Sequence, residues 1–384
     1  MIALAFWLAV AGVALGYAGY PAYLALCRLI RPRPLVTRPQ EPSVEVLLVV
    51  HNAADALAAK VANLRQLDYP SWQLGICIVC DGCTDATVAV AGRLAADDVR
   101  VVVFSERRGK SACIGDVLPT LVAEVVLFVD VRQTLDAGAL QALTAALADP
   151  SVGAASGELV VLDGAGFAAG INAYWRYEKA IRRLESATGS MVGATGAIYA
   201  ARRRLIGPVP SGLILDDMWI PLSIAEAGYR IVAVEGAVAF DRASPDPQSE
   251  ERRKRRTLSG NYQLLHRFPK LALPGLHPMA ARLWGHKWSR LLAPWLLIAA
   301  FACSATLAAG GSRPYLWLFL LQVAAYALAV LGRHSRWLAR RVPPARLAAA
   351  FLSLNASALL ALGDYLRNPS PHLWRTTRYQ ESGR

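Results

Sequence analysis

The 384-residue sequence is short of charge, and of negative charge above all. Only 18% of its residues are charged, with 28 acidic side chains against 41 basic ones, and 55% are hydrophobic. This composition is too apolar for an ordinary soluble enzyme of this length, so part of the chain must face lipid. The excess of positive charge lies near the apolar segments and in the run 252–256, which favours attraction to anionic headgroups. The chain lacks a recognisable nucleic-acid module, and we expect no nucleic-acid partner.

Apolar runs close to the length of a membrane span, about 20 residues, are absent between residues 42 and 267 and lie only toward the two ends. They cover residues 2–26, 291–309, 314–331 and, marginally, 347–362. The first run lacks the basic start and small-residue cleavage site of a signal peptide. We therefore expect a retained anchor over 1–30, a membrane domain over 291–365, and a tail over 366–384.

Basic flanks predict the orientation of these segments. Arg28, Arg31 and Arg33 follow the first run and place its end in the cytoplasm, so residues 42–267 form a cytoplasmic domain. The basic loop 334–344 agrees with this orientation. A fourth crossing would leave the arginine-bearing tail outside, so either the last helix is re-entrant or interfacial, or the positive-inside rule fails there.

A segment before the second apolar run has a different pattern. Apolar and basic residues alternate between His277 and Arg290, and Trp284 and Trp288 are four residues apart. This pattern predicts an interfacial helix over 271–290, lying along the bilayer surface.

Within the cytoplasmic domain, β-branched apolar runs alternate with helical patterns. The runs are 44–50, 75–80, 100–104 and 124–129. This alternation predicts an α/β fold with a mostly parallel sheet covered by helices on both faces. Polar residues follow the runs, namely Asn52, Asp81, Ser105 and Asp130. They are expected at the sheet edge where open α/β sheets bind ligands.

The stretch ICIVCDGCTDAT, residues 76–87, contains both a CxxCxxC spacing and two aspartates. Side chains alternate faces along a strand, so Cys77 and Cys80 should point to opposite sides of the sheet and cannot share a metal. We interpret them as small core residues in a reducing compartment. Asp81 and Asp85 follow the strand, where they either bind a ligand or only cap the next helix.

Seven segments in order resemble the motifs of membrane-embedded family 2 glycosyltransferases of GT-A fold, related to cellulose, hyaluronan and poly-N-acetylglucosamine synthases. They are HNAAD (51–55), DGCTD (81–85), RGK (108–110), DVR (130–132), GATGAIYAARR (193–203), LDD (215–217) and RRKRRT (252–257). The resemblance implies a Rossmann-like nucleotide-sugar domain flanked by transmembrane helices.

By this resemblance, Asp81 contacts the uracil of a UDP-sugar with Asn52 nearby. Lys110 lies near the donor phosphates, unless it is only a surface lysine of a helix. Asp130 matches the first Asp of a DxD motif, which holds a divalent ion, Mg²⁺ or Mn²⁺, on the diphosphate. The third motif position is Arg132, so either Asp130 still holds the ion or Arg132 neutralises part of the diphosphate charge.

The resemblance also implies a general base and an acceptor side. Asp217 matches the base that deprotonates the acceptor hydroxyl, beside Asp216, although both are also acids favourable to a helix start. Thr195 and Gly196 belong to a loop expected beside the acceptor, or to a plain glycine-rich turn. Two arginines, Arg253 and Arg256, match a QxxRW motif and either contact diphosphate or form a solvated basic face. Thr257 replaces the tryptophan, which weakens the case for processive synthesis.

The predicted function is transfer of a sugar, with inversion, from a nucleotide-sugar to a hydroxyl of a membrane-associated or polysaccharide acceptor. Two alternatives stay open: a non-catalytic nucleotide-binding subunit, and a transferase that loads sugar onto polyprenyl phosphate. Arginine outnumbers lysine 35 to 6, which suggests a GC-rich bacterial genome and so a bacterial inner-membrane location for an enzyme of the cell envelope.

Overall fold

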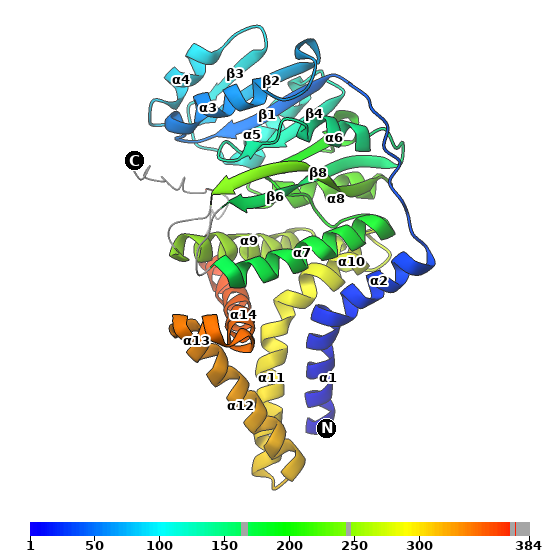
Figure 1. Ribbon diagram of the computed structural model, residues 1–384, viewed down its shortest axis with the longest axis vertical. Helices are drawn as coiled ribbons and strands as arrows, with labels where there is room; N and C mark the ends of the chain where they lie inside the picture. The colour runs from blue at the N-terminus through cyan, green and yellow to red at the C-terminus, as the bar shows by residue number, and fades with distance from the viewer. Residues whose placement is uncertain (163–167, 243–246, 369–372, 374–384) are drawn as a thin grey trace.

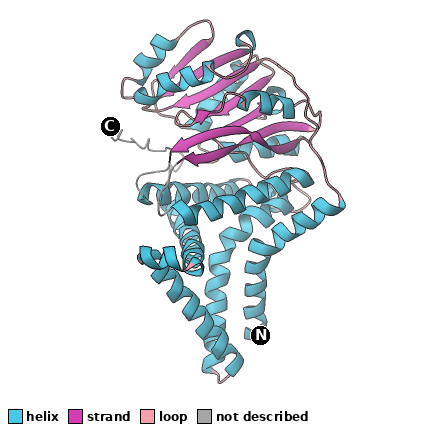
Figure 2. Cartoon of the chain, in the orientation of Figure 1, coloured by secondary structure: helices cyan, strands magenta, loops and turns pink. Residues whose placement is uncertain are grey.

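The computed structural model describes residues 1–162, 168–242, 247–368 and 373. Most of the predicted tail, 366–384, lies outside the described residues. A single sheet with helices on both sides sits at one end of the molecule, and long helices extend from it (Figure 1). Figure 2 shows that strands are confined to that end.

Within the described ranges, the sheet has eight strands, in the order β3-β2-β1-β4-β7-β6-β8-β5. Four of the predicted runs form strands, within a residue or two of the expected bounds: β1 Val44–Val50, β2 Leu74–Asp81, β3 Val99–Phe104 and β4 Val125–Val129. These four pair in parallel, so their carboxyl ends share one edge, as predicted.

The second half of the sheet reverses direction. It contains β5 Thr134–Leu135, β6 Val152–Leu162, β7 Ile198–Arg202 and β8 Arg230–Arg242. Strand β7 is antiparallel to both β4 and β6, β5 is antiparallel to β8, and β6 runs parallel to β8. The sheet is therefore mixed, with parallel pairs in the majority.

Helices cover both faces of the sheet and bury two cores. One face packs against α3 Ala54–Arg65, α4 Thr87–Leu94 and α6 Ala139–Ala146, and the other against α5 Lys110–Val117, α8 Asp216–Glu226 and α9 Pro247–Arg267. Cys80 belongs to the first core and Cys77 to the second, as the strand alternation predicted. Their opposite directions exclude a shared metal, and no three metal-type ligands cluster among the described residues.

Among the residues that the structure describes, four helices are long and apolar enough to cross a membrane. The first is kinked, with α1 Ile2–Ala14 and α2 Tyr20–Ile30 joined by a π-helical turn, Leu15–Gly19. The others are the continuous helix Ala280–Ala309, α12 Arg313–His334 and α14 Pro343–Arg367, with the short α13 Arg336–Arg341 before the last.

The predicted interfacial helix over 271–290 is wrong in form. A 3₁₀ turn, Pro269–Ala272, is followed by α10 Ala280–Leu283, a π-helical turn Trp284–Trp288 and α11 Ser289–Ala309, and the last three make one helix. Trp288 is 1% exposed and packs in the core beneath α8 and α9, whereas Trp284 is 39% exposed. The two tryptophans that the sequence pattern assigned to lipid headgroups therefore differ, with Trp288 in the core and Trp284 exposed.

The last apolar helix, α14, contacts α12 at its start and α9 at its end. Its start contacts the end of α12, since a Cβ at Gly332 would lie 2.5 Å from the Ala345 carbonyl oxygen. Its end contacts α9 through a bidentate pair between Arg255 and Asp364, with Nε to Oδ2 at 2.8 Å. In Figure 1, α11 and α12 extend to the level of the N-terminus, and α14 stays close beneath α9.

Candidate active site

Three carboxylates from two separate segments surround one lysine at the carboxyl edge of the sheet. Lys110 begins α5 after Gly109, whose φ of 88° favours glycine. The Lys110 Nζ lies 2.9 Å from Asp130 Oδ1 and 3.4 Å from Asp216 Oδ2. Burial lowers the pKa of Lys110, but the carboxylates of Asp130 and Asp216 outweigh it and hold that pKa above its ordinary value. Lys110 is thus a charged residue inside the site, and the surface-lysine alternative is wrong.

Asp217 lies against the glycine loop that the sequence placed beside the acceptor. Its backbone oxygen accepts a hydrogen bond from Ala194 N at 2.9 Å, and its Oδ2 accepts one from Gly196 N at 3.2 Å. A Cβ at residue 196 would come within 3.1 Å of that same oxygen, so glycine permits the approach. The loop with Thr195 and Gly196 therefore lies next to the predicted base.

The pKa of Asp217 is raised toward neutral pH. Burial raises its pKa, the neighbouring Asp216 and then Asp130 raise it further, and Lys110 opposes them, with a result of about 6. A carboxylate with such a pKa is half protonated just below neutral pH and takes up a proton more readily than an ordinary aspartate. The electrostatics suit a general base.

The basic helix α9 contributes one of its arginines to this cluster. A Cβ at Gly260 would lie 2.5 Å from Leu215 Cγ, so α9 packs directly on the residue that precedes Asp216. Arg256 is partly buried, and loss of solvent lowers its pKa, while Asp216, Asp217 and Asp130 act in the opposite direction. Arg256 therefore faces the carboxylates, and the solvated-face alternative does not apply to it.

Arg253 and Arg132 converge on a different carboxylate that the sequence analysis missed. Asp241, near the end of β8, is 3% exposed and pairs with Arg132, and Gln133 Nε2 donates to it at 3.1 Å. Arg253 Nη1 lies 3.9 Å from Asp241, and its Nη2 lies 2.7 Å from Glu250. Arg132, which stands where the DxD motif has its second carboxylate, thus forms an ion pair with Asp241.

Asp130 remains suited to a cation. One of its oxygens accepts from Lys110, its side chain is 44% exposed, and its other oxygen has no partner among the described residues. Mg²⁺ and Mn²⁺ bind hard oxygen ligands, and Mg²⁺ sites often combine one or two carboxylates with substrate phosphates. One exposed carboxylate oxygen fits such a site once a diphosphate supplies further oxygens.

The predicted base-binding residue, Asp81, is engaged by the protein itself. It is 0% exposed, and its two carboxylate oxygens accept hydrogen bonds from Arg108 N at 2.6 Å and Gly109 N at 2.9 Å. A Cβ at Gly82 would lie 2.4 Å from Arg107 N, so the loop closes directly over the turn. Both carboxylate oxygens of Asp81 are thus occupied by the backbone, which blocks a direct contact with a nucleotide base in this structure. Asp81 instead holds the loop that leads into Lys110.

Asn52 and Asp85 shape the neighbouring turn. Asn52 has a positive φ of 49° and its Oδ1 accepts from Thr84 N at 2.8 Å, which ties the ends of β1 and β2 together. Asp85 Oδ1 accepts from Thr87 N at 2.9 Å at the start of α4. Asp85 thus holds the backbone at the start of α4, one residue before Ala86, the N-cap residue.

Tyr199 of β7 lies beneath the cluster and was not distinguishable from a core strand residue in the sequence. It is 0% exposed, stacks on Phe128 with ring centroids 4.5 Å apart, and its hydroxyl has no hydrogen-bond partner among the described residues. Burial raises its pKa well above the ordinary value, helped by Asp216 and Asp217. Its neutral hydroxyl faces the same carboxylates from below.

Comparison with known proteins agrees with this geometry. The sequence profile described as glycosyl transferase family group 2 matches residues 125–330, more than half of the chain. The chain belongs to this family. The predicted enzyme class, glycosyltransferase, is therefore confirmed, while a specific relation to cellulose or hyaluronan synthases stays a prediction. No curated protein sequence matches the chain.

Among solved structures, the family fold extends over nearly the whole molecule. The chain is similar to the mannosyltransferase PcManGT from Pyrobaculum calidifontis in complex with GDP-Man and Mn²⁺, with a TM-score of 0.70, 24% identity, and coverage of 94% of this chain and 99% of that one. A GalNAc-T7 structure with UDP, GalNAc and Mn²⁺ has a TM-score of 0.43 and 13% identity, covering 59% of this chain and 48% of that one. The predicted α/β GT-A-like fold is confirmed.

Proposed function

We propose that this family member transfers a sugar from a nucleotide-sugar to a hydroxyl of a membrane-associated acceptor, with inversion at the anomeric carbon. The observation that carries the proposal is the convergence of Asp130, Asp216 and Asp217 on Lys110, with Arg256 facing the same carboxylates. Such a site combines cations for a diphosphate with a basic carboxylate.

In the proposed mechanism, Asp217 accepts the proton of the acceptor hydroxyl while that oxygen bonds to the anomeric carbon. The bond between this carbon and the diphosphate oxygen breaks, and the electron pair leaves with the nucleoside diphosphate. A single displacement of this kind inverts the configuration. Lys110 and Arg256 stabilise the negative charge that develops on the leaving group. The Gly196 N–H, bound to Asp217 Oδ2, holds the carboxylate in position.

A divalent cation is proposed at Asp130. Asp130 would hold it, and the bound cation would offset negative charge on the diphosphate leaving group. Support comes from the exposed oxygen of Asp130 and from the Mn²⁺ in the similar mannosyltransferase structure. Arg132 is paired with Asp241, so the positive charge for the diphosphate is assigned to Lys110 and Arg256.

The proposed donor is not restricted to the uracil nucleotide that the sequence analysis expected. Asp81 is closed to a base in this structure, and the similar mannosyltransferase carries GDP-mannose. Both UDP-linked and GDP-linked sugars are therefore candidates.

The proposed setting is a bacterial inner membrane with the sheet domain in the cytoplasm. The first helix and the pair α11 and α12 cross the bilayer, and α14 lies within the cytoplasmic leaflet under α9. Three crossings and one interfacial helix leave the basic residues of the loop 334–344 on the cytoplasmic side.

The test is a screen of UDP- and GDP-sugars for release of the nucleoside diphosphate by the full chain in nanodiscs, with Asp217→Asn as the matched inactive variant. Release by the wild type that depends on Asp217 is expected. A protein that binds nucleotide but releases none from any donor would be a binding subunit, and the proposal would be wrong.

A further inference from the structure

Two cysteines of the CxxCxxC stretch lie together at the end of β2, at a place that the proposed mechanism does not use. Cys80 is the penultimate residue of β2 and pairs with Val50 of β1. The Cys83 Sγ lies 3.7 Å from the carbonyl oxygen of the same Val50. Both cysteines pack in the core that α3 and α4 cover, whereas Cys77 belongs to the core on the other face. Of the two CxxC pairs, the fold therefore brings the second one together.

The thiols of this pair are in direct contact. A hydrogen bond joins the Cys80 and Cys83 side chains, and both cysteines are free. Cys80 is 0% exposed, while Cys83 is partly exposed on the turn that follows β2. A disulfide needs Cβ atoms about 3.5–4.5 Å apart. Two contacting thiols three residues apart can reach that distance by a small shift of the turn.

The thiol of Cys83 is the more reactive of the two. The hydrogen bond from Cys80 lowers the pKa of Cys83, and although burial opposes it, a hydrogen bond from the Asn52 backbone adds to the lowering. The same thiol contact raises the pKa of Cys80. Burial raises the pKa of the Cys77 and Cys113 thiols. A partly exposed, more acidic thiol beside a second thiol is typical of a cysteine that peroxides oxidise.

The turn between the two cysteines also holds the loop that leads into Lys110. Asp81, which follows Cys80, accepts two hydrogen bonds from the backbone of this loop, at 2.6 and 2.9 Å. A Cβ at Gly82 would lie 2.4 Å from the same backbone, so the turn and the loop are packed without a gap. A shift that brings Cys83 onto Cys80 would therefore displace the loop and the start of α5.

We propose that Cys83 is a site of oxidation by peroxide, and that Cys80 resolves it to a disulfide that displaces the Lys110 loop. The Cys83 thiolate attacks hydrogen peroxide, the O–O bond breaks, and a sulfenic acid and hydroxide form. The Cys80 sulfur then bonds to the Cys83 sulfur, the S–O bond breaks, and the hydroxyl leaves with the Cys80 proton as water. A thiol reductant reverses the oxidation, so the disulfide is transient in a reducing compartment.

The test follows the tryptic peptide 66–93, which contains Cys77, Cys80 and Cys83. The full chain in nanodiscs is treated with hydrogen peroxide, catalase removes the excess, and iodoacetamide labels free thiols after denaturation. The reduced peptide should take up three labels and the oxidised peptide one, and dithiothreitol should restore all three. Three labels after peroxide would overturn the proposal.

Cys77→Ser is the matched control, because Cys77 has the same spacing from Cys80 but lies on the opposite face of the sheet. This variant should form the disulfide as the wild type does, and its failure to do so would overturn the assignment of the pair.

Cys80→Ser separates the two chemical steps. Serine keeps a hydrogen-bond donor beside Cys83 but cannot form a disulfide. Oxidation should therefore stop at the sulfenic acid, which dimedone captures, and fragmentation of the peptide should place the adduct on Cys83. An adduct on Cys77, or none, would overturn Cys83 as the oxidised sulfur.

The effect on turnover rests on the proposed function, whereas the disulfide does not. Oxidised wild type should release nucleoside diphosphate from its donor about tenfold more slowly or worse, because a displaced loop misplaces Lys110. Dithiothreitol should restore the rate, and Cys83→Ser should keep its own untreated rate after peroxide.

The failures are distinguishable. A wild type that releases no nucleoside diphosphate from any nucleotide-sugar would overturn the proposed function, and the peptide result would still decide the disulfide. Complete disulfide formation with an unchanged rate of release would overturn the displacement of the Lys110 loop.

Discussion

The acid limb of the pH–rate profile should report the environment of Asp217. Burial, Asp216 and Asp130, against Lys110, raise the pKa of Asp217 from an ordinary 3.8 to about 6. The difference of about two units corresponds to ~3 kcal/mol between the two protonation states. In the wild type, kcat/KM for the donor should fall below pH 6, to about a tenth of its plateau at pH 5, because the free enzyme's base is then protonated.

Two substitutions should move this limb in opposite directions. Asp216→Asn removes the adjacent negative charge and should lower the apparent pKa by about one unit. Lys110→Met removes the opposing cation and should raise it, besides weakening donor binding. Asp217→Asn should reduce turnover by about 10² to 10⁴-fold. A profile that is flat between pH 5 and 8, or an upward shift in Asp216→Asn, would refute the assignment of Asp217 as the base.

The same shift makes a prediction for stability. The folded-state pKa of Asp217 lies above its unfolded value, so its favourable contribution is present at low pH and is lost as pH rises from about 4 through 6. Above pH 6 the ionised carboxylate costs at most ~3 kcal/mol, and about half of that at pH 5. Asp217→Asn should therefore unfold at higher temperature than the wild type at pH 7.5, with a smaller difference at pH 5. Equal differences at both pH values would contradict the electrostatic account.

Three further outcomes are expected. Excess chelator and Asp130→Asn should each lower transfer about tenfold or more, with added Mn²⁺ restoring only the chelated wild type; full activity in chelator would exclude the metal. A double-mutant cycle with Arg255→Gln and Asp364→Asn should give a coupling energy of about 0.2–1 kcal/mol in thermal unfolding, since both side chains are partly exposed; no coupling would mean the pair does not hold α14 on α9. Purified protein should contain no stoichiometric iron or zinc, and Cys77→Ala or Cys80→Ala should cost about 1 kcal/mol of stability without loss of activity; one bound metal per chain would contradict the core assignment.

The features predicted best from the sequence are those governed by strand geometry. Alternation along β2 separated Cys77 from Cys80, and parallel pairing brought Asp81 and Asp130 to one edge. The ordered motifs also placed Gly196 beside Asp217. Each of these depends on local period or on the order of segments, which a sequence displays directly.

Features that depend on contacts between distant segments were not predictable. Asp241 binds Arg132 across 109 positions, and neither residue's surroundings signal the other. Asp81 is bound by the backbone N–H groups of Arg108 and Gly109. Every residue except proline has such a group, so the sequence pattern does not reveal this contact. In the sequence, Trp288 is surrounded by basic and apolar residues, as is typical of a tryptophan at lipid headgroups. Only its packing with α8 and α9 reveals a core position.

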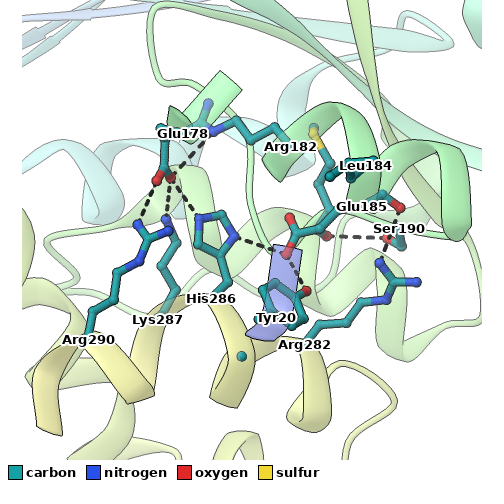
Figure 3. Close-up of polar contacts among 12 residues, drawn as sticks. Tyr20, Glu178, Arg182, Leu184, Glu185, Ser190, Arg282, His286, Lys287 and Arg290 are labelled. Atoms are coloured by element: carbon teal, nitrogen blue, oxygen red, sulfur yellow. Dashed lines mark hydrogen bonds and ion pairs between the residues drawn. The ribbon is translucent and has the colours of Figure 1, made fainter. Parts of the chain in front are cut away.

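The ionic contacts of Glu178 with His286, Lys287 and Arg290 (Figure 3) have a mechanical consequence. They join α7, Ala168–Thr188, to the first turns of the helix Ala280–Ala309, which is long and apolar enough to cross a membrane. Separating the two helices would leave buried charges without partners, at a large cost in free energy. A displacement of the apolar helix would therefore carry α7, and the wall that α7 forms in the cavity beside Thr195, along with it.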